Sequence, residues 1–198
     1  MIWLVGGPSV GKSSAARAIQ AAGGLRDSWV LADDHHLLRV VWADQLVRSG
    51  HPVDDRWSGW TVPFLDGRVV GRPRAGHRAL RILDGMYRAA VAMSHAGNNV
   101  VVEDVVWEAS VAVLARQSFA AVGAFVVRLF CPVTVALARE RARADRFVGS
   151  VAAYASEPEL ISDVDLSLDT SVLHPSAIAD QVLEAHRTST AQPTSGAR

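Results

Sequence analysis

Short apolar runs alternate with longer amphipathic stretches through most of the chain. The first run covers residues 2–5 and leads through a glycine-rich turn into an alanine-rich stretch at 13–22, an order that predicts strand, loop and helix. A second run, 29–32, ends in a polar cluster at 33–36. We expect a buried strand there, with its polar end at the edge of the sheet where α/β proteins bind ligands.

The alternation continues to residue 187. Between 76 and 96, apolar residues recur at three- and four-residue steps, as on one face of a helix. The same reasoning predicts strands at 100–102, 125–130 and 165–169, and helices at 110–121, from Pro132 onward and at 175–187. Strands that alternate with helices predict the α/β class, with a parallel sheet covered by helices on both faces.

Residues 42–74 break this pattern. They are rich in proline and glycine, with Trp42, Trp57 and Trp60 scattered among charged residues, and we interpret them as an insertion rather than a linker. The aromatic rings suit a planar or sugar-bearing ligand, or they fill the core beneath the insertion.

Composition narrows the class further. The chain has 198 residues, 49% of them hydrophobic, so we expect a single domain at 1–187 and a disordered tail at 188–198. The basic and acidic residues number 20 each, and this zero net charge predicts neither a nucleic-acid nor a membrane partner. The single Cys131 excludes an internal disulfide, and the apolar N-terminal run is too short for a signal peptide or a spanning helix, so a cytoplasmic location is expected.

The glycine-rich turn matches the P-loop (Walker A) pattern G-x-x-x-x-G-K-[ST], and it follows a predicted strand and opens a predicted helix, as that motif requires. Gly6 and Gly11 allow successive N–H groups to turn toward a phosphate, and the helix start adds positive potential. Lys12 would reach the β- and γ-phosphates, and Ser13 would offer its hydroxyl to Mg²⁺. The predicted nucleotide site comprises Gly6, Gly7, Pro8, Ser9, Val10, Gly11, Lys12, Ser13 and Ser14.

Two aspartates close the second predicted strand. A kinase needs a carboxylate that fixes the acceptor hydroxyl in line with the γ-phosphorus and takes its proton. Neighbours in a strand point to opposite faces, so one of Asp33 and Asp34 faces the site, and we assign the catalytic base to Asp34. Asp33 and His35 are then acceptor-pocket candidates, together with Trp57 and Trp60. Alternatively, both aspartates cap the next helix.

Glu103 and Asp104 follow three valines of another predicted strand. An acid in this position binds Mg²⁺ directly or through water beside the P-loop serine. We expect one of the two to support Mg²⁺. An acid here can equally orient the acceptor, and a solvated strand end is the alternative without a function.

An arginine-rich segment follows the predicted strand at 125–130. Arg139, Arg143 and Arg146 are spaced by four and three, so on a continuous helix they share one face. Guanidinium groups on a lid would neutralise the transferring phosphoryl group and exclude water, with Arg143 and Arg146 as catalytic residues and Arg139 as a nucleotide ligand. Alternatively, Glu140 and Asp145 pair with these arginines on an ordinary surface helix.

Four segments together resemble the chloramphenicol phosphotransferase family, a branch of the small P-loop kinases: GGPSVGKS, ADDHHL, VVVEDVVWE and CPVTVALARERARADRFVGS. The resemblance covers most of residues 1–187 and is weakest in 42–74, where an acceptor would bind. It implies a five-stranded parallel sheet and phosphorylation of an antibiotic hydroxyl with ATP. In the family's register, Asp34 falls on the catalytic base, and DVDLSLDTS is similar to the final strand.

These observations favour an ATP-dependent O-phosphotransferase with Mg²⁺ as cofactor, a lid at about 139–150 and a hydroxylated small molecule, expected to be an antibiotic, as acceptor. A metabolic, nucleotide-sugar or zeta-toxin-type kinase would share the donor site and differ in the acceptor pocket. From a different class, a nucleotide-dependent switch protein would bind the triphosphate without transfer, although the sequence lacks the N-K-x-D motif of GTPases. The choice of ATP or GTP and the oligomeric state, a homo-oligomer included, are left open.

Overall fold

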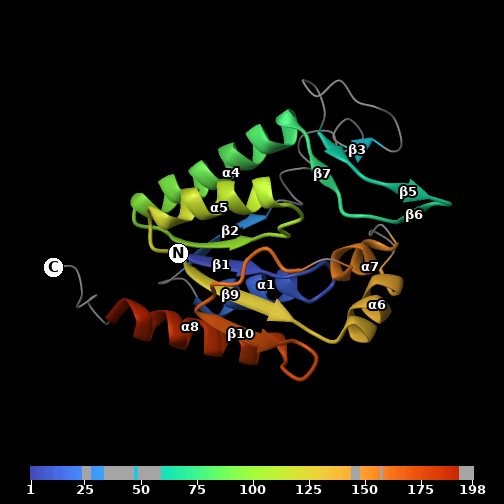
Figure 1. Ribbon diagram of the computed structural model, residues 1–198. Helices are drawn as coiled ribbons and strands as arrows, with labels where there is room; N and C mark the ends of the chain where they lie inside the picture. Colours follow the sequence, from blue (N-terminus) through green and yellow to red (C-terminus); the bar gives the residue numbers. More distant parts are fainter. Residues whose placement is uncertain (24–27, 34–46, 49–58, 144–147, 157, 192–198) are drawn as a thin grey trace.

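A five-stranded sheet forms the centre of the computed structural model, which describes residues 1–198 except 24–27, 34–46, 49–58, 144–147, 157 and 192–198 (Figure 1). The strands are β1 (Ile2–Val5), β2 (Trp29–Asp33), β8 (Asn99–Glu103), β9 (Phe125–Phe130) and β10 (Leu166–Asp169). They lie in the order β10-β9-β1-β8-β2, and every pairing between them is parallel. The predicted α/β class and five-stranded parallel sheet are therefore confirmed.

Helices cover both faces of this sheet. α1 (Lys12–Gly23) and α8 (Pro175–Ala191) pack on one face, and α4 (His77–His95) and α5 (Ala109–Ala120) pack on the other (Figure 1). Two shorter helices, α6 (Val133–Arg141) and α7 (Ser150–Ala155), lie beyond the carboxyl ends of the strands. The edge of the sheet that carries the P-loop is therefore flanked by α6 and α7.

Alternation along the strands divides the buried side chains into two clusters. Ile2, Leu4 and Val101 pack on the side of α1 and α8, while Trp3 and Val102 pack on the side of α4 and α5. The reason is the two-residue period of a strand, which sends successive side chains to opposite faces. The same alternation decides which way the acidic side chains at the end of β8 point.

The segment between β2 and α4 contributes short strands to the domain. They are β3 (Val47–Arg48), β4 (Trp60–Thr61) and β7 (Arg74–Ala75) in one small sheet, and β5 (Phe64–Leu65) and β6 (Arg68–Val69) in a hairpin. The hairpin turns at Asp66 and Gly67, whose φ of 49° and 74° fit a two-residue Asp-Gly turn. Trp60, Val62 and Val69 are buried in the cluster beside α4, so these residues join the insertion to the core.

The C-terminal helix is longer than the sequence predicts. α8 continues to Ala191, so the disordered tail predicted from residue 188 is wrong for 188–191. The hydroxyls of Thr188 and Thr190 donate to the backbone carbonyls four residues earlier, so their side chains are bonded within the helix. The rest of the predicted tail, 192–198, lies outside the described residues.

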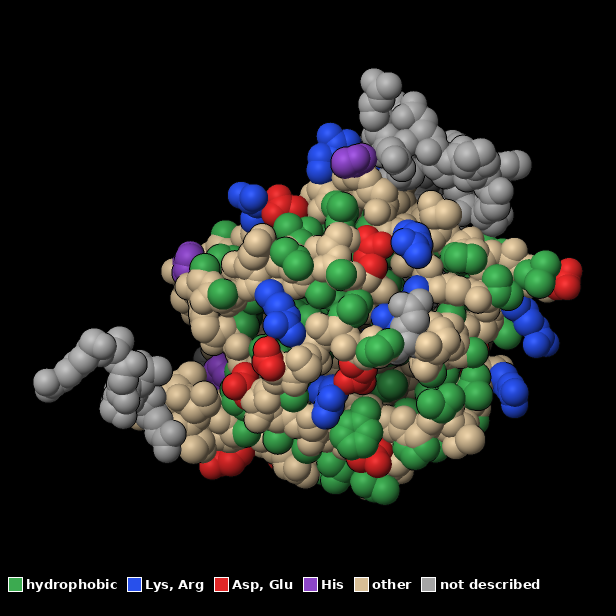
Figure 2. All heavy atoms as spheres, in the orientation of Figure 1, with side chains coloured by type: hydrophobic (Ala, Val, Ile, Leu, Met, Phe, Trp, Pro, Cys, Tyr) green, Lys and Arg blue, Asp and Glu red, His purple; other side chains and the backbone are tan. Residues whose placement is uncertain are grey.

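The described surface carries charges of both signs. Figure 2 shows basic and acidic side chains interspersed over the face in view, in keeping with the formal net charge of zero. None of the helices that the structure describes has the length and apolar content needed to cross a membrane.

Candidate active site

The loop between β1 and α1 has the backbone of a phosphate-binding P-loop. Gly6 has a φ of 146° and Gly11 a φ of 98°, values that residues with a side chain rarely adopt, and Ser9 has a φ of 60°. A Cβ atom at Gly6 would lie 2.2 Å from the carbonyl oxygen of Leu129, so only glycine fits there. Turns of this kind allow successive N–H groups to line a concave anion site.

Lys12 is the first residue of α1 and folds back over the loop. Its side chain is buried, and Nζ donates to the carbonyl oxygens of Gly6 at 3.0 Å and Gly7 at 2.8 Å. The ammonium group therefore lies where the helix dipole also favours an anion. A phosphate group in this loop would meet both the lysine and the start of the helix.

The hydroxyl of Ser13 donates to Oε1 of Glu103 at 2.6 Å. β8 lies beside β1 with Leu4 opposite Glu103, so the end of one strand brings its carboxylate to the helix that follows the other. Glu103 is 7% exposed, and its second oxygen, Oε2, is buried without a hydrogen-bond partner among the described residues. Mg²⁺ prefers oxygen ligands, so a buried carboxylate oxygen without a hydrogen-bond donor, next to a serine hydroxyl, is a suitable ligand for this ion.

Asp104 points to the opposite face of the sheet. Its Oδ2 accepts the hydroxyl hydrogen of Tyr87 from α4 at 2.6 Å, and its backbone N–H donates to Leu4 at 3.1 Å. Burial raises the pKa of Asp104 above its usual range, although the hydrogen bond from Tyr87 opposes the rise. The other oxygen of Asp104, Oδ1, is buried without a hydrogen-bond partner among the described residues, as Oε2 of Glu103 is, so the two acids differ in their neighbours. Glu103 adjoins Ser13, whereas Asp104, also predicted to support the metal, is a buried partner of Tyr87.

The predicted acceptor residues are placed only in part. The backbone of Asp33 ends β2 and lies opposite Glu103 in the parallel pairing. Trp60 is 7% exposed and packs in the core cluster beside α4, as the core-filling alternative expects. Four predicted site residues lie outside the described residues: Asp34, His35, Trp57 and Arg146.

Arg139 braces the far end of the P-loop. Its guanidinium donates to the hydroxyl and carbonyl oxygens of Thr170, at 2.9 and 2.7 Å, and to the carbonyl of Val10 at 3.4 Å. The Thr170 hydroxyl in turn donates to Val10 at 2.6 Å. These bonds join α6, the end of β10 and the loop. Sequence reasoning did not single out Thr170, although its place directly after a predicted strand was a usable signal.

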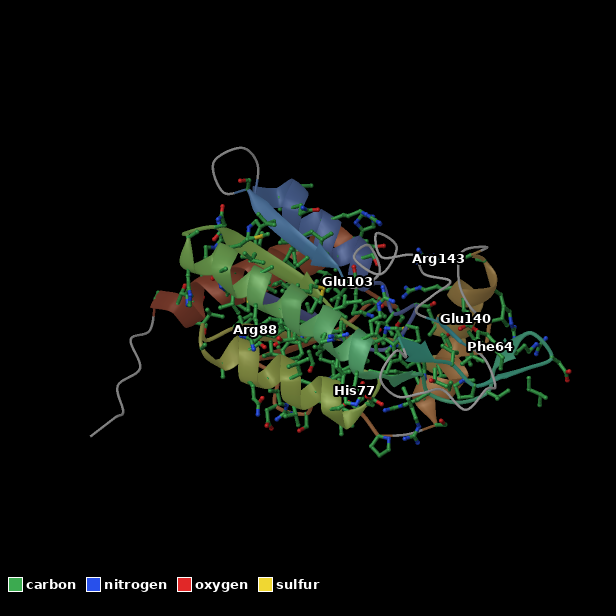
Figure 3. The ribbon with its side chains drawn as sticks, turned by 90° about the horizontal axis from the view of Figure 1, so that it is seen from above. Phe64, His77, Arg88, Glu103, Glu140 and Arg143 are labelled. Atoms are coloured by element: carbon green, nitrogen blue, oxygen red, sulfur yellow. The ribbon has the colours of Figure 1, made fainter. Side chains whose placement is uncertain are left out.

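The arginine segment is not one continuous helix. α6 ends at Arg141, and Arg143 lies exposed after that end, so Arg139 and Arg143 do not share a helical face as predicted. A helix end between them turns the chain away from the axis of α6. Figure 3 shows Arg143 beyond the carboxyl end of β8, which Glu103 marks.

Glu140 is buried against the backbone that follows α6. It is 2% exposed, and its two oxygens accept the backbone N–H groups of Gly149 at 3.0 Å and Val151 at 2.9 Å. The carboxylate thereby caps the start of α7, where unpaired N–H groups favour a negative charge. The alternative of an ordinary surface helix therefore does not describe Glu140, whose side chain is buried.

The loop, the parallel sheet and the contact of Ser13 with Glu103 define a nucleotide-binding protein of the P-loop kinase type. The model of a family described as chloramphenicol phosphotransferase-like protein matches residues 1–187. The chain belongs to this family, which confirms the resemblance seen in the sequence. A search of curated protein sequences gives no match.

Several solved structures are similar to the chain over nearly its whole length. The APS kinase CysC of Mycobacterium tuberculosis, in complex with AMPPNP and APS, has 20% identity and a TM-score of 0.62, covering 94% of this chain and 96% of that one. A gluconokinase from Sinorhizobium meliloti 1021 has 19% identity and a TM-score of 0.58, covering 96% and 94%. The tunicamycin resistance protein of Deinococcus radiodurans has 15% identity and a TM-score of 0.55, covering 94% of each chain. At these identities the likeness shows a shared fold.

Family membership makes the chain a small-molecule phosphotransferase. Together with the P-loop kinase fold, it supports an ATP-dependent kinase that acts on a small molecule. The donor site agrees with this class, because a P-loop lysine, a serine and a strand-end carboxylate converge in it.

Proposed function

We propose that the chain transfers the γ-phosphoryl group of ATP to a hydroxyl group of a small-molecule acceptor, with Mg²⁺ as the metal. The observation that carries this proposal is the 2.6 Å contact between Ser13 and Glu103 beside the P-loop lysine, Lys12. A serine hydroxyl, a carboxylate oxygen and a lysine around one phosphate loop are the protein groups that a metal–triphosphate complex needs.

On the donor side, the loop N–H groups and the start of α1 would bind the phosphates. Lys12 would exchange the loop carbonyls for β- and γ-phosphate oxygens, and Ser13 and Glu103 would hold Mg²⁺, directly or through water. The bound cation would neutralise charge on the phosphates. Arg139 would act by bracing the loop through Val10.

On the acceptor side, we propose Asp34 as the base that orients the hydroxyl and takes its proton. The preceding residue, Asp33, ends β2 opposite Glu103, so the chain leaves the sheet at the edge that carries the proposed metal residues. A base at this edge would face the γ-phosphate from the side of the insertion.

The rest of the acceptor pocket is assigned to the insertion and the lid. His35 and Trp57 are proposed to contact the acceptor, while Trp60 supports the insertion from the core. Arg143 and Arg146 are proposed to neutralise the charge that develops on the transferring phosphoryl group. Asp104, held by Tyr87 on the other face, is left out of the metal site.

An antibiotic is the acceptor that we favour. The family takes its description from chloramphenicol phosphotransferase, and the similar D. radiodurans protein is named for tunicamycin resistance. The rival is a metabolic kinase, because the similar structures also include an APS kinase and a gluconokinase. Both share the donor site, so the acceptor distinguishes them.

Mass spectrometry of reactions with ATP, Mg²⁺ and a panel of hydroxylated antibiotics, nucleosides and sugars tests the proposal. We expect a gain of one phosphoryl group on an antibiotic, chloramphenicol being the first to try, and no gain with Lys12→Ala. Transfer to a sugar or another metabolite would replace the antibiotic assignment. Tight ATP binding with no modified acceptor would instead favour a nucleotide-dependent switch protein.

A further inference from the structure

Helix α7 contacts three parts of the molecule that are far apart in the sequence. It touches the P-loop, it is bound at both ends by the insertion, and its first turn is capped from α6. A helix of 6 residues has little stability of its own, so these contacts set its position. Whatever holds α7 in place therefore also fixes what it presents to the P-loop.

The ring of Tyr154 in α7 lies directly against Gly7 of the P-loop. A Cβ atom at Gly7 would be 2.9 Å from Cδ1 of the ring, closer than carbon atoms pack, so the glycine makes room for the tyrosine. The carbonyl of Gly7 is also the acceptor for Lys12 Nζ at 2.8 Å. The ring thus supports the peptide group that holds the lysine.

Tyr154 serves here as a neutral ring. Burial raises the pKa of Tyr154 to about 12, with a smaller contribution from Glu159, so its hydroxyl is protonated at neutral pH. Trp107 meets the ring edge to face, with 5.7 Å between the centroids. On this side the loop also borders a cavity of about 260 Å³ that α6 and α7 line, which makes the ring a main support of the loop there.

Arg72 of the insertion holds Tyr154. Its guanidinium carbon lies 4.7 Å from the centroid of the ring, and its Nη2 donates to the carbonyl oxygens of Tyr154 at 2.7 Å and Pro158 at 3.1 Å. Arg72 is 7% exposed, so water competes little for these contacts. A cation at this place also suits the C-terminal end of α7, whose carbonyl groups are left without helical partners.

The insertion binds the N-terminal end of α7 as well. The N–H of Val69 donates to the carbonyl of Val148 at 2.8 Å. Gly149 has a φ of 96°, and a Cβ atom there would lie 2.3 Å from the carbonyl oxygen of Val69, so the hairpin packs directly on the start of the helix. The insertion therefore holds both ends of the helix that carries Tyr154.

We propose that Tyr154 is a positioning residue for the P-loop and that Arg72 keeps it in place, so that the insertion acts on the donor site through α7. This inference rests on the proposed function, which gives the acceptor to the insertion and the nucleotide to the P-loop. An acceptor bound to the insertion would hold Tyr154 against Gly7 and strengthen nucleotide binding. By linkage, the nucleotide would strengthen acceptor binding by the same factor.

Calorimetric titration of the full chain with AMPPNP and Mg²⁺ tests this without an acceptor. Tyr154→Leu is expected to raise the Kd about tenfold and Arg72→Met about fivefold, although Arg72 is not part of the loop. Tyr154→Phe keeps the ring and should bind within about twofold of the wild type. Arg68→Met, at an exposed position of the same hairpin, is the matched control and should leave the Kd unchanged.

Double variants test whether Arg72 acts on the P-loop through the ring of Tyr154. Because Arg72 is proposed to act through the ring, Tyr154→Leu combined with Arg72→Met should bind no more weakly than Tyr154→Leu alone. Gly7→Ala should weaken binding when the tyrosine is present, because it pushes the ring away, and should add little when residue 154 is leucine. Effects that simply add in both pairs would overturn the route through Tyr154.

Amide hydrogen exchange of residues 6–13 supplies a readout that needs no nucleotide. Faster exchange of this segment in Tyr154→Leu and Arg72→Met, with exchange in β8 and β9 unchanged, supports the inference. Exchange and Kd equal to those of the wild type would overturn it. A wild-type chain that does not bind AMPPNP would remove the proposed function, while exchange would still decide whether Tyr154 positions the loop.

Discussion

The P-loop and the insertion lie at the same edge of the sheet but are built in different ways. The backbone turns of the P-loop depend on nearby residues, because Gly6 and Gly11 permit them and Lys12 bonds to carbonyls five and six residues away. Distant side chains such as Arg139 then brace the formed loop. The insertion is held by distant contacts, such as the bond from Arg72 to Pro158, which spans 86 residues. One is a local motif, and the other depends on the assembled fold.

This difference has a functional consequence. A phosphate loop made of backbone groups needs only a strand, a few glycines and a helix, so the same donor chemistry can occur in kinases with unrelated acceptors. An acceptor pocket held through Tyr154 and Arg72 can differ from one kinase to the next without altering the loop sequence. Under the proposals made above, the insertion and α7 together would determine the acceptor.

The largest effects are expected from replacing the proposed base on the acceptor side, Asp34, and the P-loop lysine on the donor side, Lys12. Asp34→Asn should lower kcat about 1,000-fold, because the amide cannot take the hydroxyl proton, while the Kd for AMPPNP stays within about twofold. Lys12→Ala should instead raise that Kd by at least about tenfold, since it removes the cation of the loop. Single-turnover kinetics and calorimetry separate the two effects. Full turnover in Asp34→Asn would remove the residue from the base role.

Replacing the two acids at the end of β8, Glu103 and Asp104, should change activity less, but the two variants should differ clearly in their dependence on Mg²⁺. Glu103→Gln should lower kcat about 100-fold at low Mg²⁺ and raise the Mg²⁺ concentration needed for half-maximal activity, because the carboxylate beside Ser13 loses its charge. Asp104→Asn keeps an oxygen acceptor for Tyr87 and should leave the Mg²⁺ dependence unchanged. A titration of activity with Mg²⁺ measures both. The opposite result would move the metal to the α4 face.

Features that depend on local sequence could be predicted, and features that depend on distant contacts could not. The loop and the five strands were predictable, because local pattern and turn chemistry determine them. The contacts of Glu103 and Asp104 could not be predicted from the residues next to them in the sequence. They depend on which strand lies beside β8 and on which face of the sheet carries Tyr87. The cap that Glu140 provides could not be predicted, because the N–H groups that donate to it lie nine and eleven residues further on, across the end of α6. Arg72 gave no sequence signal at all.

Tyr87→Phe tests whether the α4 face of β8 is structural. The change removes the hydroxyl that donates to buried Asp104 and keeps the ring contact with Phe119 at 5.0 Å between centroids. A buried carboxyl group that loses its donor should lower the free energy of unfolding by about 2 kcal/mol, measured by urea denaturation. The Mg²⁺ dependence of activity should not change. A loss below about 0.5 kcal/mol would mean that Asp104 finds another partner.

The smallest expected effect lies at the amino ends of the strands, away from both the loop and the insertion. His186 of α8 packs between the rings of Trp29 and Phe125, with centroids 5.7 and 5.8 Å away. Burial lowers the pKa of His186 to about 4, and the amino group of Met1 adds to the shift. The unfolded chain has a histidine pKa near 6.5. Between pH 4 and pH 6.5 it therefore binds more protons than the folded chain does.

Stability should accordingly be complete above pH 6.5 and should fall as the pH drops through this window toward 4. His186 is only half-buried, so we expect a loss of about 1 kcal/mol by pH 5, or about 2–4 °C in Tm. His186→Phe should remove that part of the pH dependence in thermal melts while leaving the Kd for AMPPNP at neutral pH unchanged, because the ring lies far from the P-loop. A variant that kept the full acid sensitivity would assign it to carboxyl groups elsewhere. A changed Kd would mean that packing under α8 reaches the donor loop through α1, which would weaken the view that the backbone turns of the loop are set by its own residues.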